Sequence, residues 1–195
     1  MLNFTEFENS ILDISQELPV HPTKEIPQRN TEEIDKIIFH CTAQPWNVWE
    51  VTDYDLKPNH IDEEGCPCIT YSYFIEKDGT VYKCLEPEAK SWHVGKWNAT
   101  SLGFCINFEA LPETFPPKVQ FQKAVFLAAY LSIKFKVETK NVLGHRELLE
   151  TGFYYENGEK ILRKECPGIS INLDKFRMEV EIVKSKWLSQ KLDVI

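Results

Sequence analysis

The sequence has no long apolar run, no secretory signal and no basic cluster. None of its segments approaches the roughly 18 consecutive apolar residues that a membrane helix requires. The N-terminal stretch "MLNFTEFENSILDISQELP" has neither a basic region nor an unbroken apolar core, so it is not a signal peptide. Lys and Arg number 22 against 30 Asp and Glu, a formal net charge of −8. We therefore expect a protein synthesised in the cytoplasm, with no membrane insertion and no nucleic-acid partner.

The common compact catalytic and metal motifs are missing as well. There is no HExxH, no CxxC pair and no GxSxG nucleophile elbow, and the "CPC" step at Cys66 to Cys68 is too tight for a zinc knuckle. The six cysteines, in a chain made in the cytoplasm, indicate thiols or metal ligands rather than a disulfide framework. The spacing of the histidines and cysteines alone thus predicts a soluble α/β domain and does not decide whether it holds a zinc site.

What the sequence does contain is enough apolar material for one folded domain. The chain has 195 residues, of which 43% are hydrophobic. Residues 1–34 hold three X-Pro steps and many polar residues, which predicts an extended N-terminal lead-in with one short helix. The domain itself is expected over residues 35–195.

Strand and helix patterns follow one another along this domain. Period-2 alternation and β-rich runs mark the strands, and an i, i+3, i+4 apolar stripe marks the helices. The expected elements are strands at 36–42 and 101–109, a hairpin at 69–86 around "DG", and helices at 117–135 and 172–192. The mixture predicts an α/β fold, a single domain with a central, mainly mixed β-sheet flanked by helices.

The five histidines divide into two groups. His21 and His60 lie in polar segments and are expected at the surface. His40 lies in the 36–42 strand, on the face opposite Cys41, whereas His93 and His145 follow in "SWHVGKWN" and "NVLGHRE". Each of these three, taken alone, is more often a hydrogen-bonded structural histidine than a metal ligand.

Five motifs in a fixed order carry a resemblance to a known family. They are "IIFHCTA", "TYSYFIEKDGTVYK", "SWHVGKWNATSLGFCI", "VLGHRE" and "KECPG". In this order, and with compatible gaps, they resemble the zinc N-acetylmuramoyl-L-alanine amidases, a family that includes amidase-type phage lysozymes and peptidoglycan recognition proteins. The resemblance runs from about residue 36 to about residue 177.

The resemblance implies a metal centre with two catalytic residues beside it. One Zn²⁺ per chain would be held by His40, His145 and Cys166, with a fourth position open for water. Tyr71 and Lys164 are implied as the catalytic residues, which stabilise the oxyanion of the tetrahedral intermediate. The identity of the general base stays open between Tyr71 and the zinc hydroxide.

The resemblance also implies a substrate and a reaction. His93 and Asn98 are the implied substrate-binding residues of a cleft for peptidoglycan or muropeptide, in a monomer. The implied reaction is hydrolysis of the amide bond between N-acetylmuramic acid and L-alanine, with zinc-bound water as the nucleophile. We expect a phage or prophage endolysin that reaches the cell wall through a holin or another export route. A cytoplasmic muropeptide-recycling amidase and a non-catalytic recognition module are the alternatives.

Two features depart from the family pattern. Ser72 follows Tyr71, where a histidine is common. A longer insertion separates His145 from Cys166, and an Asn-Gly step between β-prone runs predicts a hairpin at about residues 151–162. This hairpin is either a neutral surface excursion or a flap that shapes the substrate cleft.

Overall fold

The computed structural model describes residues 2–42, 44–59, 61, 63–148, 153–156, 159–162 and 165–192. For 153–156, 159–162, 191 and 192 only the backbone is described. The helices are α1 (Phe4–Glu8), α2 (Val48–Asp55), α3 (Lys118–Lys134) and α5 (Leu173–Leu192), with short 3-10 turns η1 (Thr31–Glu33), η2 (Gly95–Trp97), η3 (Thr139–Asn141) and η4 (His145–Glu147). The strands are β1 (Ile11–Asp13), β2 (Lys36–Cys41), β3 (Tyr73–Ile75), β4 (Val81–Lys83), β5 (Ser101–Ile106), β6 (Val142–Gly144), β7 (Phe153–Glu156) and β8 (Glu159–Leu162).

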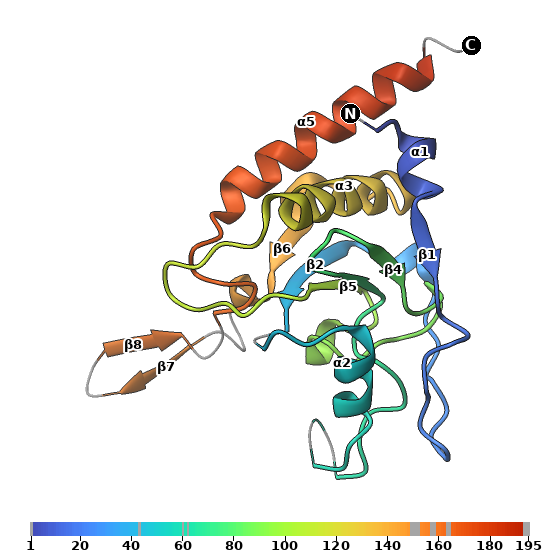
Figure 1. The fold of residues 1–195 in the computed structure, drawn as a ribbon, viewed down its shortest axis with the longest axis vertical. Helices are drawn as coiled ribbons and strands as arrows, with labels where there is room; N and C mark the ends of the chain where they lie inside the picture. The colour runs from blue at the N-terminus through green and yellow to red at the C-terminus, as the bar shows by residue number, and fades with distance from the viewer. Residues whose placement is uncertain are drawn as a thin grey trace.

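A six-stranded mixed sheet forms the centre of the molecule, in the order β1-β4-β3-β5-β2-β6 (Figure 1). The β3–β4 hairpin is antiparallel, and the other neighbouring pairs are parallel. Parallel pairs need crossover segments, and α3 supplies the one between β5 and β6. The predicted α/β class, with one mixed sheet flanked by helices, is confirmed.

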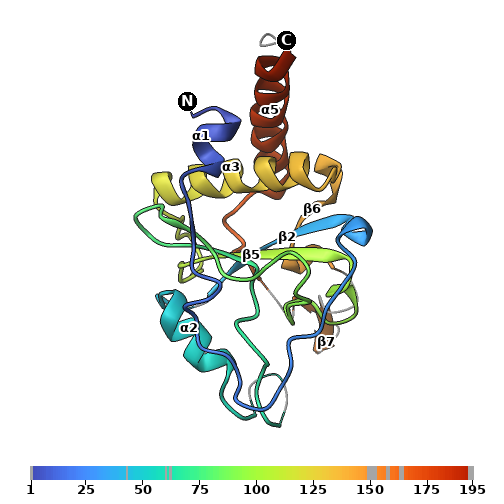
Figure 2. The same ribbon diagram turned by 90° about the vertical axis from the view of Figure 1, so that its right-hand side faces the viewer.

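One face of the sheet is the main hydrophobic core. Figure 2 shows α3 and α5 on the same side of the sheet, and α5 packs on α3 and, near its start, on the sheet itself. Phe39 of β2 packs on Phe104 of β5 at 4.7 Å between ring centroids and on Phe176 of α5 at 4.9 Å. The alternation predicted for β2 and β5 is therefore correct: Phe39 and Phe104 face the helices, and His40 faces away from them.

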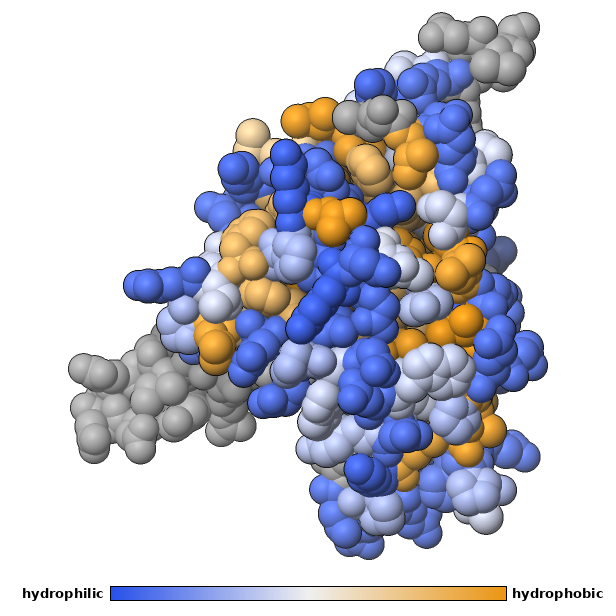
Figure 3. Space-filling model, in the orientation of Figure 1, coloured by the Kyte–Doolittle hydropathy of each residue, from blue (hydrophilic) through white to orange (hydrophobic). Residues whose placement is uncertain are grey.

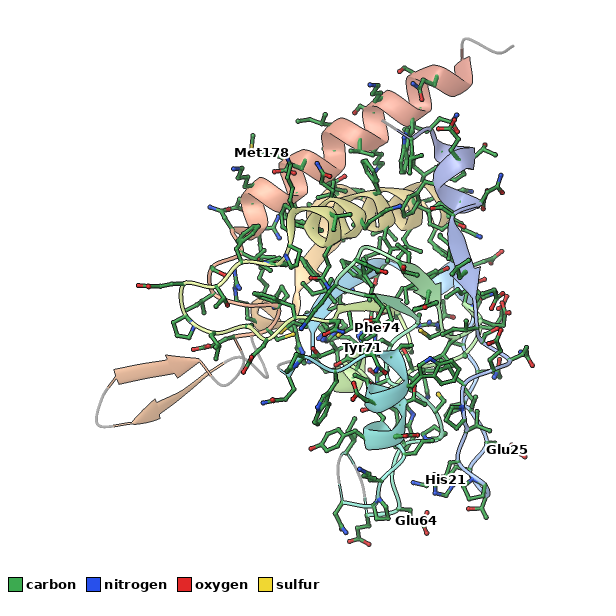
Figure 4. All side chains as sticks on the ribbon, viewed as in Figure 1. His21, Glu25, Glu64, Tyr71, Phe74 and Met178 are labelled. Carbon is green, nitrogen blue, oxygen red and sulfur yellow. The ribbon has the colours of Figure 1, made fainter. Side chains whose placement is uncertain are left out.

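The opposite face of the sheet carries a smaller apolar cluster, against which α2 packs. Asn47 caps α2 by accepting hydrogen bonds from the N–H groups of Trp49 and Glu50, and the Glu50 carboxylate accepts one from the Asn47 N–H. This reciprocal cap fixes where the helix begins. Figure 4 shows Tyr71 and Phe74 between the sheet and α2, on the side away from α3 and α5.

The first 34 residues are more regular than the extended lead-in expected from their prolines. Helix α1 begins at an Asn3 capping box, and β1 pairs in parallel with β4 as the edge strand. Phe7 of α1 is fully buried and stacks on Trp187 of α5 at 5.7 Å between ring centroids. The X-Pro dipeptides of this segment disfavour a helix over most of its length. They are compatible with β1, an edge strand of three residues.

Strands β7 and β8 form a separate antiparallel pair at the place where the sequence predicts a hairpin. The C-terminal helix begins as expected, because the Asn172 side chain accepts a hydrogen bond from the Lys175 N–H. Among the described residues, no helix is long and apolar enough to cross a membrane. The face in Figure 3 is mostly hydrophilic, with its apolar side chains in separate small patches.

Candidate metal centre and cleft

The three predicted metal ligands meet at one end of the sheet. His40 lies near the carboxyl end of β2 and His145 directly follows β6, its parallel neighbour, in which Gly144 is paired with Phe39. Their rings are therefore adjacent, at 4.6 Å between centroids. Cys166 completes the group, and one ligand atom from each of the three residues lies within 4.8 Å of the others. This is the arrangement that the resemblance implied.

The geometry and chemistry of these donors fit zinc. Two imidazole nitrogens and one thiolate form a ligand set that Zn²⁺ accepts with an open fourth position. Bond lengths of about 2.0–2.1 Å to nitrogen and about 2.3 Å to sulfur, at a tetrahedral angle, place the two ligand atoms about 3.6 Å apart. The Cys166 Sγ lies 3.7 Å from the His40 Nδ1. The described residues can hold the ion without rearrangement of this pair.

Arg146 holds the loop that carries Cys166 against the second histidine. Its backbone N–H donates to the Cys166 carbonyl at 2.9 Å. Its guanidinium donates to the carbonyls of Gly168 and Ile171. Because Arg146 is the neighbour of His145, these bonds tie two metal ligands together across 20 intervening residues. Arg146 was not predicted as a site residue, although it directly follows His145 in the "GHRE" motif.

The Cys166 thiol is protonated in the absence of metal. Burial raises the pKa of Cys166 well above its ordinary value. The Cys41 N–H points at the sulfur, at 3.3 Å, and this is a bond that a thiolate would strengthen. Metal binding therefore has to release the thiol proton.

Tyr71 lies beside the first ligand. Its ring centroid is 5.1 Å from that of His40. Burial raises the pKa of Tyr71 well above 10, so the phenol keeps its proton and can donate a hydrogen bond. Lys164, the other predicted catalytic residue, lies outside the described residues.

The two predicted substrate-binding residues occupy different places. His93 lines the cleft and lies against His40, with 3.0 Å between the His93 Nδ1 and the His40 Nε2. Burial, helped by the Arg29 guanidinium and by His145, lowers the pKa of His93 to about 3. Asn98 instead accepts a hydrogen bond from the Val94 N–H at 2.8 Å, within the same loop.

A cleft of about 540 Å³ opens over the metal centre. It combines the three ligands with an acidic group, an aromatic wall and apolar rim positions. Besides the ligands it is lined by Cys41, Thr42, Asp55, Ile61, Thr70, Tyr71, Trp92, His93, Ala110 and Glu165. Lys24, from the N-terminal segment, lies over the Trp92 ring at 5.5 Å. The first 34 residues therefore support one wall of the cleft.

Asp55 is a cleft residue that the sequence analysis missed. It is the last residue of α2 and is only 3% exposed. Its Oδ2 accepts hydrogen bonds from both the N–H and the hydroxyl of Thr70, each at 2.8 Å. Burial raises the pKa of Asp55 from 3.8 to about 6, against those hydrogen bonds, which lower it. Its helical spacing from the buried Val48 and Val51 was the available signal.

Comparison with known proteins defines the class to which this fold and centre belong. Residues 30–169 match the N-acetylmuramoyl-L-alanine amidase family. This match spans most of the chain, including all three predicted metal ligands, and the chain belongs to that family. The predicted enzyme class, an N-acetylmuramoyl-L-alanine amidase, is confirmed.

Individual relatives come from phages, bacteria and animals. The endolysin of Klebsiella phage KP32 is 25% identical over 158 residues, which are 79% of this chain and 92% of the relative. The endolysin amidase LysCS of Clostridium intestinale has a similar fold, with a TM-score of 0.64 and 19% identity over 88% of this chain and 95% of the other. Drosophila peptidoglycan recognition protein SD has a TM-score of 0.61 and 17% identity, over 83% and 90% of the two chains.

Proposed function

We propose that this chain is a zinc-dependent endolysin of phage or prophage origin, which cleaves the amide bond between N-acetylmuramic acid and L-alanine in peptidoglycan. The observation that carries the proposal is the His40, His145 and Cys166 group at the floor of the cleft. A purely structural zinc site normally closes with four protein ligands, whereas the described residues bring three together here. The endolysin relatives support the cell wall as the place of action.

The three proposed ligands differ in the charge that they would bring to the ion. His40 and His145 contribute neutral nitrogens, and Cys166 contributes the single negative charge, so the bound ion keeps a net positive charge. Zinc at this site would supply a Lewis acid for the scissile carbonyl and would lower the pKa of a coordinated water to about 7.

Tyr71 and Lys164 are proposed to act on the oxyanion. Tyr71 lies beside His40 as a protonated phenol, and its hydroxyl would donate a hydrogen bond to the negative charge that develops on the scissile carbonyl oxygen. Lys164 is two residues before Cys166 in the sequence, and its ammonium would supply a second donor. Removing one such donor typically lowers the rate about 10²–10³-fold. We expect Lys164→Ala to lose that factor in turnover while it keeps its zinc, and loss of the metal with the activity would contradict this assignment.

The substrate is tested by supplying the purified protein with intact cell walls in one assay and with soluble muropeptides in another. The expected product is a new L-alanine amino terminus, released with a lactyl carboxylate, and cleavage is expected to be faster on walls. Faster cleavage of muropeptides would favour a recycling amidase. Binding of peptidoglycan without cleavage by the zinc-loaded protein would make it a recognition module, and the proposal would fail.

We also propose that the protein works as a monomer with one zinc and reaches the wall through a holin or another export route. The negative formal charge and the absence of a membrane-spanning helix among the described residues agree with release of a free protein. Light scattering together with metal analysis would give the mass of the particle and its zinc stoichiometry.

A further inference from the structure

A line of hydrogen bonds connects the first metal ligand to a loop on the far side of the cleft. It runs from the Trp97 carbonyl to the Ser101 hydroxyl at 2.7 Å and from that hydroxyl to the His93 Nε2 at 3.1 Å. It continues from the His93 Nδ1 to the His40 Nε2 at 3.0 Å. His93 and Ser101 are both buried, and the His93 ring also lines the cleft.

The Trp97 carbonyl at the start of this line of hydrogen bonds determines where each proton lies. A carbonyl oxygen has no hydrogen, so the Ser101 hydroxyl must donate to Trp97. A hydroxyl has one hydrogen, which leaves its oxygen only as an acceptor toward His93. The proton between Ser101 and His93 therefore lies on the His93 Nε2.

The same reasoning assigns the proton of His40, the proposed metal ligand. His93 is buried, which favours the uncharged imidazole, and an uncharged imidazole with its proton on Nε2 offers Nδ1 as an acceptor. The proton between the two rings then lies on the His40 Nε2. The His40 Nδ1 is left as the unprotonated nitrogen, and it is this atom that faces the Cys166 Sγ at 3.7 Å.

The surrounding residues hold His93 in the required place. Arg29 donates to the carbonyls of Asn98 and Ser101 and thereby fixes the loop between them. Gly103 of β5 leaves room for the ring, since a Cβ there would lie 2.5 Å from the His93 Nδ1. The close approach explains why this strand position has no side chain.

We propose that His93 and Ser101 are positioning residues that fix the tautomer of His40, so that its Nδ1 binds the metal. The inference rests on the proposed metal site and adds to it a role for two residues outside the ligand set. Partners of this kind orient a metal-bound histidine and raise its basicity, and their loss typically lowers metal affinity about 10–100-fold. His93 then acts through His40, in addition to any contact with substrate.

The direct test is nitrogen NMR of the wild-type protein with ¹⁵N-labelled histidine, first zinc-free and then zinc-loaded. The expected result is His40 protonated on Nε2 in both states, with Nδ1 as the nitrogen that shifts on metal binding. Protonation of the His40 Nδ1 in the zinc-free protein, or coordination through Nε2, would overturn the inference. The proposed amidase activity would survive that result, whereas failure to bind zinc at all would instead overturn the proposed function.

Matched variants give a second readout in zinc affinity, measured by competition with a chromophoric chelator. Ser101→Ala is expected to lose about 10–100-fold. Ser132→Ala, which removes a buried hydroxyl without a hydrogen-bond partner on α3, is expected to lose none.

The conservative variant separates positioning from simple packing. His93→Asn keeps an acceptor at the place of Nδ1 and is expected to retain affinity within a few-fold, whereas His93→Leu is expected to lose about 10–100-fold. Equal losses in these two folded variants, or equal affinities in the two serine variants, would contradict the positioning role.

Discussion

Replacing Asp55 by asparagine should stabilise the zinc-free protein at neutral pH and remove part of its pH dependence. The carboxyl group is 3% exposed, and burial raises its pKa from 3.8 to about 6. Because the folded state holds the proton more tightly than the unfolded chain, stability falls as pH rises from about 4 to about 6. The rise in pKa corresponds to about 3 kcal/mol of unfolding free energy lost above that window.

Asparagine is the suitable substitution because the Asp55 Oδ2 accepts two hydrogen bonds from Thr70. An amide oxygen accepts the same two bonds and cannot ionise. We expect the stability difference between Asp55→Asn and wild type to be up to about 3 kcal/mol more favourable at pH 8 than at pH 4. Other carboxyl groups titrate in both proteins and cancel in this difference.

The assay is urea unfolding in the presence of a chelator at several pH values. Asp53→Asn, an exposed change on the same helix, serves as the control and should alter stability by less than about 0.5 kcal/mol throughout. A stability difference for Asp55→Asn that is the same at pH 4 and pH 8 would refute the reasoning, since it would mean that the buried carboxyl does not titrate in this window.

Three further predictions concern the surroundings of the centre. Gly103→Ala places a Cβ 2.5 Å from the His93 Nδ1 and should cost about 1–3 kcal/mol of unfolding free energy; in a His93→Ala background the same change should cost little. Arg29→Ala leaves the part-buried carbonyls of Pro87, Asn98 and Ser101 without their donor and should cost about 2–4 kcal/mol of unfolding free energy in urea. A variant as stable as wild type would contradict this. Replacing residues 151–162 by a short turn should leave zinc affinity intact and change the ratio of rates on walls and muropeptides, and an unchanged ratio would identify the insertion as a neutral excursion.

The sheet was predictable because its signals are local. Alternation along β2 and β5 depends only on which side of the strand each residue faces, and burial of one face against α3 and α5 confirms it. The Asp-Gly turn between β3 and β4 is likewise a property of adjacent residues. Strands β1 and β6, three residues each, were not predicted, because so short a segment shows no period.

The metal ligands could be predicted from the order of the motifs. The contacts that support these ligands could not be predicted. Asp55 and Ser101 act through partners that are 15 and 8 residues away in sequence, and nothing in a single sequence pairs them. His93 was assigned to the substrate cleft from its motif. Its bond to His40 spans 53 residues and depends on the parallel packing of β2 and β5.

The central claim is tested most directly by measuring zinc content and amide cleavage together in wild type, Cys166→Ala and Cys84→Ala. Cys84 is fully buried in the smaller apolar cluster and lies outside the cleft, so its variant controls for the loss of a buried thiol. We predict one zinc and full cleavage for wild type, the same for Cys84→Ala with some loss of stability, and loss of both zinc and cleavage for Cys166→Ala. A Cys166→Ala protein that binds zinc and cleaves the substrate would contradict the account.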